Sequence, residues 1–293
     1  MTLSGHADFA RYNVIADGSI VCDGALMNSF LDWAFALSPL EAIGWLIVLN
    51  VSIFIVSLLA GCIATYVFGQ SRIVESADRL SKREMKFAAA GIGVNTLITI
   101  VGWYLWKAGI LEIRRDTGWQ VLLDFFILLL VMDIGMYVLH RVAHLPWFFP
   151  IHRLHHEYDR PWALTLYVVH PLETLGFGML WLTVIVFYSS SWMGLCLYMI
   201  ANVAAGTLGH LGVEPFPRWW VRVPFLRELG TSTFHAEHHQ DVEHNFGFYT
   251  VIWDRLFGTL LPRYADTFGA ELQESVPRID LQLKKTEISP QVP

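Results

Sequence analysis

The sequence predicts an all-α integral membrane protein, a bundle of about four to five transmembrane helices with a histidine-rich helical cap at one end. Hydrophobic residues make up 54% of the 293 residues and charged residues 16%, and the mean hydropathy is +0.45. Soluble domains carry roughly a quarter charged residues, so this composition is typical of a membrane protein. The apolar residues form several long runs, and eight of the 12 histidines fall in two short segments.

The first two spans follow an N-terminal segment, residues 1–38, that has no clear periodicity. The run from Leu40 to Phe68 carries charge only at Glu41 and is long enough to cross about 30 Å of hydrocarbon. Residues 87–106 give a second span. The loop between the spans is basic, containing Arg72, Arg79, Lys82, Arg83 and Lys86. By the positive-inside rule we expect this loop on the cytoplasmic side.

Three further spans complete the bundle. Residues 119–139 lead directly into His140, while residues 172–188 and 192–208 form a hairpin joined by serines. Counting the crossings places the N-terminus outside and all the histidine motifs in the cytoplasm. Basic and aromatic residues between Arg218 and Arg227 agree with this placement. The C-terminal residues are polar and predict a loosely held tail.

The histidines are spaced so that each group shares one face of a helix. His140 and His144 are four residues apart, and the segments HRLHH and HAEHH repeat the i, i+3, i+4 pattern. The second and third groups are His152, His155 and His156, and His235, His238 and His239. Imidazole is the commonest metal-binding side chain, and a zinc site takes at most four protein ligands. Eight clustered imidazoles therefore predict more than one metal ion.

The sequence lacks the features of several other function classes. A net charge of −6 and a pI near 6.0 give no basic surplus for nucleic acid. Three dispersed cysteines without a CxxC argue against a disulfide framework or a thiolate zinc site. The sequence has no HExxH, GxSxG, P-loop or GxGxxG motif, and no histidine follows a glutamate by three residues as in carboxylate di-iron bundles.

Taken in order, the histidine motifs resemble those of the fatty acid hydroxylase and sterol desaturase superfamily. The matching motifs are HxxxH from His140, HxxHH from His152, HPLE from His170, and HxxHH from His235 followed by NFGFYTVIWDRLFGT. The resemblance covers residues 122–261, about half the chain. It implies a membrane-embedded, non-haem di-iron oxygenase that uses O2 and hydroxylates or desaturates a lipid such as a sterol or a fatty acyl chain.

The resemblance also implies a ligand set. One iron would take His140, His152, His155, His235 and His238, and the other would take His144, His156, His210 and His239. Gly206 stands where related hydroxylases have a further histidine, so His170, His244 or Asn202 through a water are candidates to complete the second iron. Asp133, seven residues before His140, and Glu173 are candidate partners of the ligands, with a purely structural role as the alternative.

Such an enzyme needs two electrons from outside. No haem or flavin motif is present, so the resemblance implies a separate ferredoxin-like or cytochrome donor. Two alternatives stay open, a membrane zinc-dependent hydrolase and a non-enzymatic metal-binding or metal-transporting protein. On this reading the chain divides into an N-terminal segment (1–38), two spans (39–118), a hydroxylase-like catalytic domain (119–262) and a polar tail (263–293).

Overall fold

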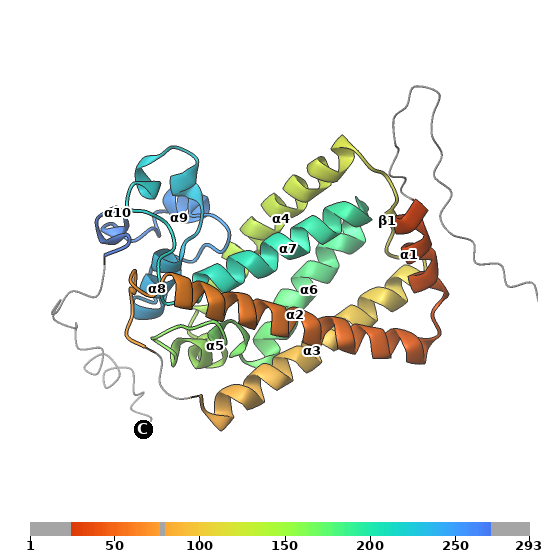
Figure 1. Ribbon diagram of the computed structural model, residues 1–293, viewed down its shortest axis with the longest axis horizontal. Coiled ribbons are helices and arrows are strands. Elements are labelled where there is room, and N and C mark those ends of the chain that lie inside the picture. The colour runs from red at the N-terminus through yellow and green to blue at the C-terminus, as the bar shows by residue number, and fades with distance from the viewer. Residues whose placement is uncertain (1–24, 77–79, 271–293) are drawn as a thin grey trace, which may run out of the picture.

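The computed structural model describes residues 25–76 and 80–270, and this part of the chain is almost entirely helical (Figure 1). The long helices are α2 (Pro39–Val67), α3 (Lys82–Lys107), α4 (Trp119–Ala143), α6 (Pro171–Phe187) and α7 (Trp192–Gly209). The short helices are α1 (Ala25–Ala36), α5 (Phe149–His156), α8 (Ser232–Gln240), α9 (Ile252–Phe257) and α10 (Tyr264–Thr267). Single 3-10 turns lie at Thr165–Tyr167, Trp220–Arg222 and Leu226–Glu228.

The bundle confirms the predicted membrane architecture. Four helices, α2, α3, α4 and α7, are long and apolar enough to cross a membrane, and α6 is a shorter apolar helix of 17 residues. Two of these helices begin at capping boxes, in which Ser38 pairs with Glu41 and Ser81 pairs with Glu84. The chain is a multi-pass membrane protein.

The five long helices pack in a closed ring in the order α2, α3, α6, α4, α7 and back to α2. Glycines allow the closest approaches. A Cβ added at Gly178 of α6 would lie 2.0 Å from Ile98 Cδ1 of α3, and one at Gly135 of α4 would lie 3.0 Å from Leu180 Cδ1 of α6. Small residues commonly mark such helix contacts in membranes, where packing rather than water exclusion holds helices together.

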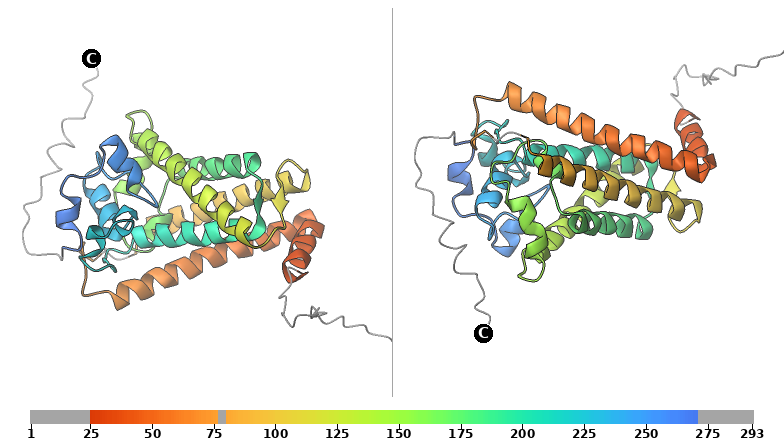
Figure 2. Two further views of the ribbon diagram at one scale, coloured as in Figure 1. Left: turned by 90° about the horizontal axis from the view of Figure 1, so that it is seen from above. Right: turned by 90° about the horizontal axis from the view of Figure 1, so that it is seen from below.

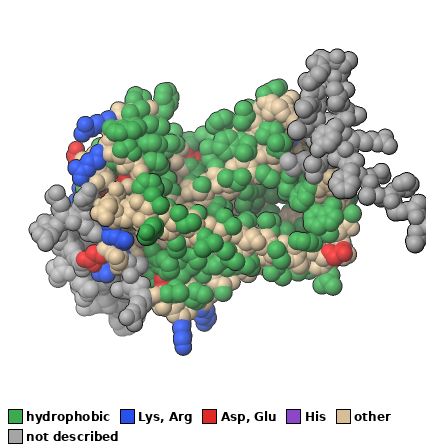
Figure 3. Space-filling view, viewed as in Figure 1, with side chains coloured by type: hydrophobic (Ala, Val, Ile, Leu, Met, Phe, Trp, Pro, Cys, Tyr) green, Lys and Arg blue, Asp and Glu red, His purple; other side chains and the backbone are tan. Residues whose placement is uncertain are grey.

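The outer face of the bundle is apolar. Figure 3 shows hydrophobic side chains over most of this face and Lys and Arg side chains mainly toward one end. Large side chains that would be costly to expose to water, such as Trp45, Ile63 and Leu130, are more than half exposed here. Lipid contact accounts for their exposure.

The end of the bundle opposite the histidines is held by one buried carboxylate. The two-residue strands β1 (Ile113–Arg114) and β2 (Ser190–Ser191) pair in parallel there. Asp124 of α4 accepts hydrogen bonds from Arg114, from the Tyr188 hydroxyl and from the Ser191 backbone N–H, each at 2.7 Å. An ionisable residue in a span is costly, and these bonds compensate it.

The histidine cap, residues 144–170 and 210–270, covers the other end of the bundle (Figures 1 and 2). Helices α2, α4 and α7 end there, while α3 and α6 begin there, so the basic loop after α2 lies at the same end as every histidine motif. Tyr264 and Phe268, at the start of the expected tail, are buried with Phe234 of α8. The expected segments 1–24 and 271–293 lie outside the described residues.

Candidate metal centre

Four elements carry the nine histidines predicted as ligands, and the fold brings all nine together. They are the C-terminal end of α4, helix α5, the residue that ends α7, and helix α8. Pro150 lies in the first turn of α5, where its missing N–H costs nothing, and the Thr231 side chain caps α8 by accepting from Phe234 N–H. The nine residues separate into two groups, His140, His144, His152, His156 and His238, and His155, His210, His235 and His239.

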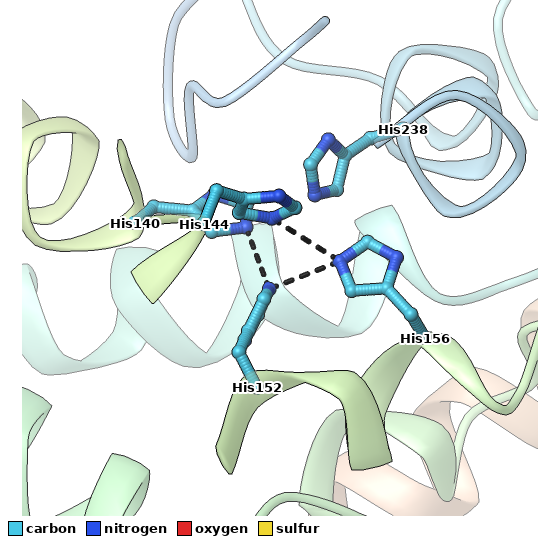
Figure 4. A group of neighbouring side chains, drawn as sticks. All are labelled: His140, His144, His152, His156 and His238. Atoms are coloured by element: carbon cyan, nitrogen blue, oxygen red, sulfur yellow. Dashed lines mark hydrogen bonds between the residues drawn. The ribbon is translucent and has the colours of Figure 1, made fainter. Parts of the chain in front are cut away.

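The first group has five imidazoles, whose ring nitrogens converge on one point (Figure 4). The Nε2 atoms of His140 and His152 are 3.2 Å apart, those of His152 and His156 are 3.0 Å apart, and those of His144 and His156 are 3.3 Å apart. Two imidazole nitrogens that each bind one metal ion at about 2.1 Å and at right angles lie about 3.0 Å apart. The observed spacing is that of ligands to a shared ion.

The second group repeats this geometry with four imidazoles. The Nε2 atoms of His155 and His210 are 3.3 Å apart, those of His210 and His235 are 3.0 Å apart, and those of His235 and His239 are 3.2 Å apart. All four residues are buried. The two groups adjoin each other, since the ring centroids of His156 and His239 are separated by 5.1 Å.

This division differs from the ligand sets that the resemblance implied. His155 and His235 lie with His210 and His239, whereas His144 and His156 lie with His140. The physical reason is the orientation of the short helices. Neighbouring imidazoles of α5 point toward different partners, since His155 faces the end of α7 and His156 faces α4.

Hydrogen bonds to Nδ1 orient several of the rings. The Nδ1 atoms of His140, His210 and His238 lie 2.8, 2.7 and 2.6 Å from backbone carbonyl oxygens. His152 Nδ1 lies 2.7 Å from a carboxylate oxygen of Glu173. An acceptor at Nδ1 places the proton there and leaves the Nε2 lone pair free to bind a metal ion.

Burial favours the neutral form of several imidazoles in the cap. It lowers the pKa of His144 to about 2, with additional repulsion from the neighbouring histidines, and it lowers the pKa of His210 to about 4. Burial also holds the pKa of His155 and His239 well below the usual range. His238 Nε2 is buried and has no hydrogen-bond partner among the described residues. Neutral, converging nitrogens with an unpartnered lone pair fit a nitrogen-rich dinuclear metal site.

The comparisons with known proteins agree with the site. Residues 125–259 match the fatty acid hydroxylase family model. Over this region, which holds all nine histidines of the two groups, the chain is similar to the fatty acid hydroxylase family. No solved structure matches it.

Curated relatives of the chain have names that refer to different lipids. Methylsterol monooxygenase 2-2 of Arabidopsis thaliana is 30% identical over 50% of this chain and 53% of the relative. A very-long-chain aldehyde decarbonylase of Oryza sativa subsp. indica is 32% identical over 48% of this chain and 54% of the relative. Human lathosterol oxidase is 23% identical over 75% of each chain. The chain thus spans about half the length of the first two relatives.

The further ligand candidates make other contacts in this structure. His170 caps α6 by accepting from Leu172 N–H, and His244 Nδ1 lies 3.1 Å from Asp241. Asn202 accepts a hydrogen bond from the Tyr249 hydroxyl. Among the described residues, neither His170 nor His244 belongs to either histidine group. Glu173 contacts a group member, His152, as a partner of a ligand would.

Asp133 fixes the loop that lies beside the histidines. Its carboxylate accepts hydrogen bonds from the backbone N–H groups of Tyr249 and Thr250, from the Thr250 hydroxyl and from the Trp253 indole. Asp254 of α9 fixes the preceding residues of the same loop, since its carboxylate accepts hydrogen bonds from the Phe246 and Gly247 N–H groups at 2.7 Å. The peptide group between Phe246 and Gly247, whose carbonyl orients His140, is therefore held in place by a buried carboxylate through its N–H.

Sequence reasoning did not identify the backbone acceptors. The carbonyls of Gly206, His244 and Phe246 orient ligand rings, and a carbonyl is present at every position, so it leaves no signal in the sequence. Gly206 lines a small cavity next to His210 and His235. A Cβ at Gly206 would lie 2.8 Å from Leu166 Cδ1, so the space of the family's further histidine is filled here.

Proposed function

We propose that the chain is a membrane-bound, non-haem di-iron oxygenase that hydroxylates or desaturates a C–H bond of a lipid such as a sterol or fatty acyl chain. The observation that carries this proposal is the pair of adjoining, largely buried imidazole groups at one end of an apolar bundle. Five imidazoles in one group exceed the four ligands that zinc accepts in structural sites. Two iron ions are the cofactors that we assign to it.

The chain's own residues would bind and shield the reacting centre. A pair of iron ions supplies the capacity to activate O2 for attack on an unactivated C–H bond, which side chains lack. The histidines hold the ions through Nε2, and Glu173 and the backbone carbonyls fix the ring orientations. Burial of the rings excludes water, and the apolar ring of helices offers a lipid a path from the membrane.

The proposal includes a partner and an orientation. Because oxygen activation consumes two electrons and the chain carries no flavin or haem motif, we propose a separate ferredoxin-like or cytochrome donor. The basic loop between α2 and α3 lies at the same end as the histidine cap. By the positive-inside rule we place the metal centre at the cytoplasmic side.

Labelled dioxygen tests the proposed reaction. Membranes containing the wild-type chain, a reducing donor system, and a panel of sterols and fatty acyl lipids should yield a lipid that gains labelled oxygen or loses two hydrogens. The His238→Ala variant should give none. His170→Asn is the matched control, because it removes a histidine outside both groups and replaces it with another good helix cap. Unlabelled hydrolysis products in place of oxidised lipids would refute the oxygenase.

A further inference from the structure

One stripe of α7 leads from the interior of the bundle to the metal centre. Tyr198, Asn202, Gly206 and His210 are spaced four residues apart and therefore share a face. Tyr198 and His210 are 2% and 3% exposed, and Gly206 is also buried, so this face points inward. Asn202 is half-buried and lies one turn from Gly206, which lines a cavity beside His210.

The amide of Asn202 is held in one orientation by two tyrosines. The Tyr249 hydroxyl donates to Asn202 Oδ1 at 2.6 Å, and it lies 2.7 Å from the Tyr198 hydroxyl. A hydroxyl has one proton to donate, so Tyr198 is the donor to Tyr249. Tyr198 in turn stacks on Trp181 of α6, with ring centroids 4.8 Å apart. In this network of hydrogen bonds, the amide oxygen of Asn202 is occupied and its amide nitrogen is not.

The two N–H groups of that nitrogen have no hydrogen-bond partner among the described residues. An unpaired amide within an apolar region costs roughly 2–7 kcal/mol relative to water, depending on the reference state. Polar groups inside spans usually face the bundle interior and mark a substrate path. A donor that is fixed in place, unpartnered and on the same helix face as His210 has the properties of a ligand-binding group.

We propose that Asn202 binds the oxygen function of the lipid substrate and so determines which lipids the enzyme accepts. This inference rests on the proposed function and narrows its substrate class to lipids that carry a hydroxyl or carbonyl oxygen away from the reacting carbon. Asn202 and His210 are eight residues apart, about 12 Å along a helix axis. The oxygen would therefore lie within roughly two helical turns of the metal centre.

Binding of matched lipid pairs tests the proposal. The probes are lathosterol with its deoxy analogue and a long-chain alcohol with the alkane of equal length, each titrated against the full-length protein in detergent. The wild type should bind the oxygen-bearing member of at least one pair about tenfold more tightly, as one hydrogen bond in an apolar site allows. Asn202→Leu should lose this preference, and Tyr249→Phe, which frees the amide to rotate, should reduce it.

The matched control is Asn50→Leu, since Asn50 is an intramembrane amide whose nitrogen already donates to Leu46 O and Thr99 Oγ1. It should keep the wild-type preference. The proposal would be overturned if the wild type bound the two lipids of each pair equally or bound none of them. It would also be overturned if the Asn202→Leu variant kept the preference. Iron content is measured on the same samples. A protein that contains no iron but keeps the binding preference would contradict the proposed di-iron oxygenase and would leave the proposed role of Asn202 supported.

Discussion

The two nitrogen atoms of each imidazole in the centre have different surroundings. Each Nε2 atom is directed at its group, whereas Nδ1 of His140, His152, His210 and His238 meets an acceptor. Only one of these four acceptors is a side chain. Because burial lowers the pKa of His210 to about 4, this ring stays neutral at physiological pH and would gain a proton only as the pH falls to about 4.

Glu173 offers the test of this orienting role. Glu173→Leu removes the acceptor from His152 Nδ1 and should weaken metal affinity about 10-fold to 100-fold, the range found for other ligand partners. Glu173→Gln keeps an acceptor oxygen and should lose less. Titration of the metal-loaded protein with a chelator measures both effects. If the leucine variant holds metal as tightly as the wild type, Glu173 does not support the site.

At the scale of helices, apolar runs predicted the membrane bundle well. The expected span from Leu40 to Phe68 is α2, Pro39–Val67, and the expected third span is α4, which continues through His140. The i, i+3, i+4 spacing also indicated correctly that the histidines of α5 and α8 lie on helices. Periodicity within a helix determines which residues share a face, so these predictions needed no tertiary information.

The division of the histidines into two groups could not be predicted in this way. It depends on how α4, α5, α7 and α8 are oriented toward one another, and neighbouring residues such as His155 and His156 join different groups. The role of Asp133 was hidden for the same reason. Its position in a span indicated a buried partner, but that partner is the loop at residues 249–253, more than a hundred positions away.

At the scale of the whole molecule, one end of the bundle carries the metal centre and the other carries the Asp124 network. The exposed apolar girdle between them defines the membrane-embedded part. A lipid that enters between the helices would therefore travel along the bundle axis toward the cap. By the positive-inside rule, we propose that the basic loop between α2 and α3 determines which end faces the cytoplasm.

Thiol labelling of intact cells measures that sidedness. In a background with the native cysteines replaced by serine, Thr117→Cys marks the end opposite the cap and Arg222→Cys marks the cap, and both positions are exposed. A membrane-impermeant reagent should label Thr117→Cys in intact cells and Arg222→Cys only after lysis. The reverse pattern would place the metal centre outside the cytoplasm.

Metal analysis of the detergent-purified protein, expressed with ample iron, tests the central claim most directly. The wild type and the His170→Asn control should hold close to two irons per chain. His238→Ala and His239→Ala, which remove one ligand from each group, should both hold less. One zinc per chain with no iron, or an iron content that neither substitution lowers, would contradict the dinuclear iron centre.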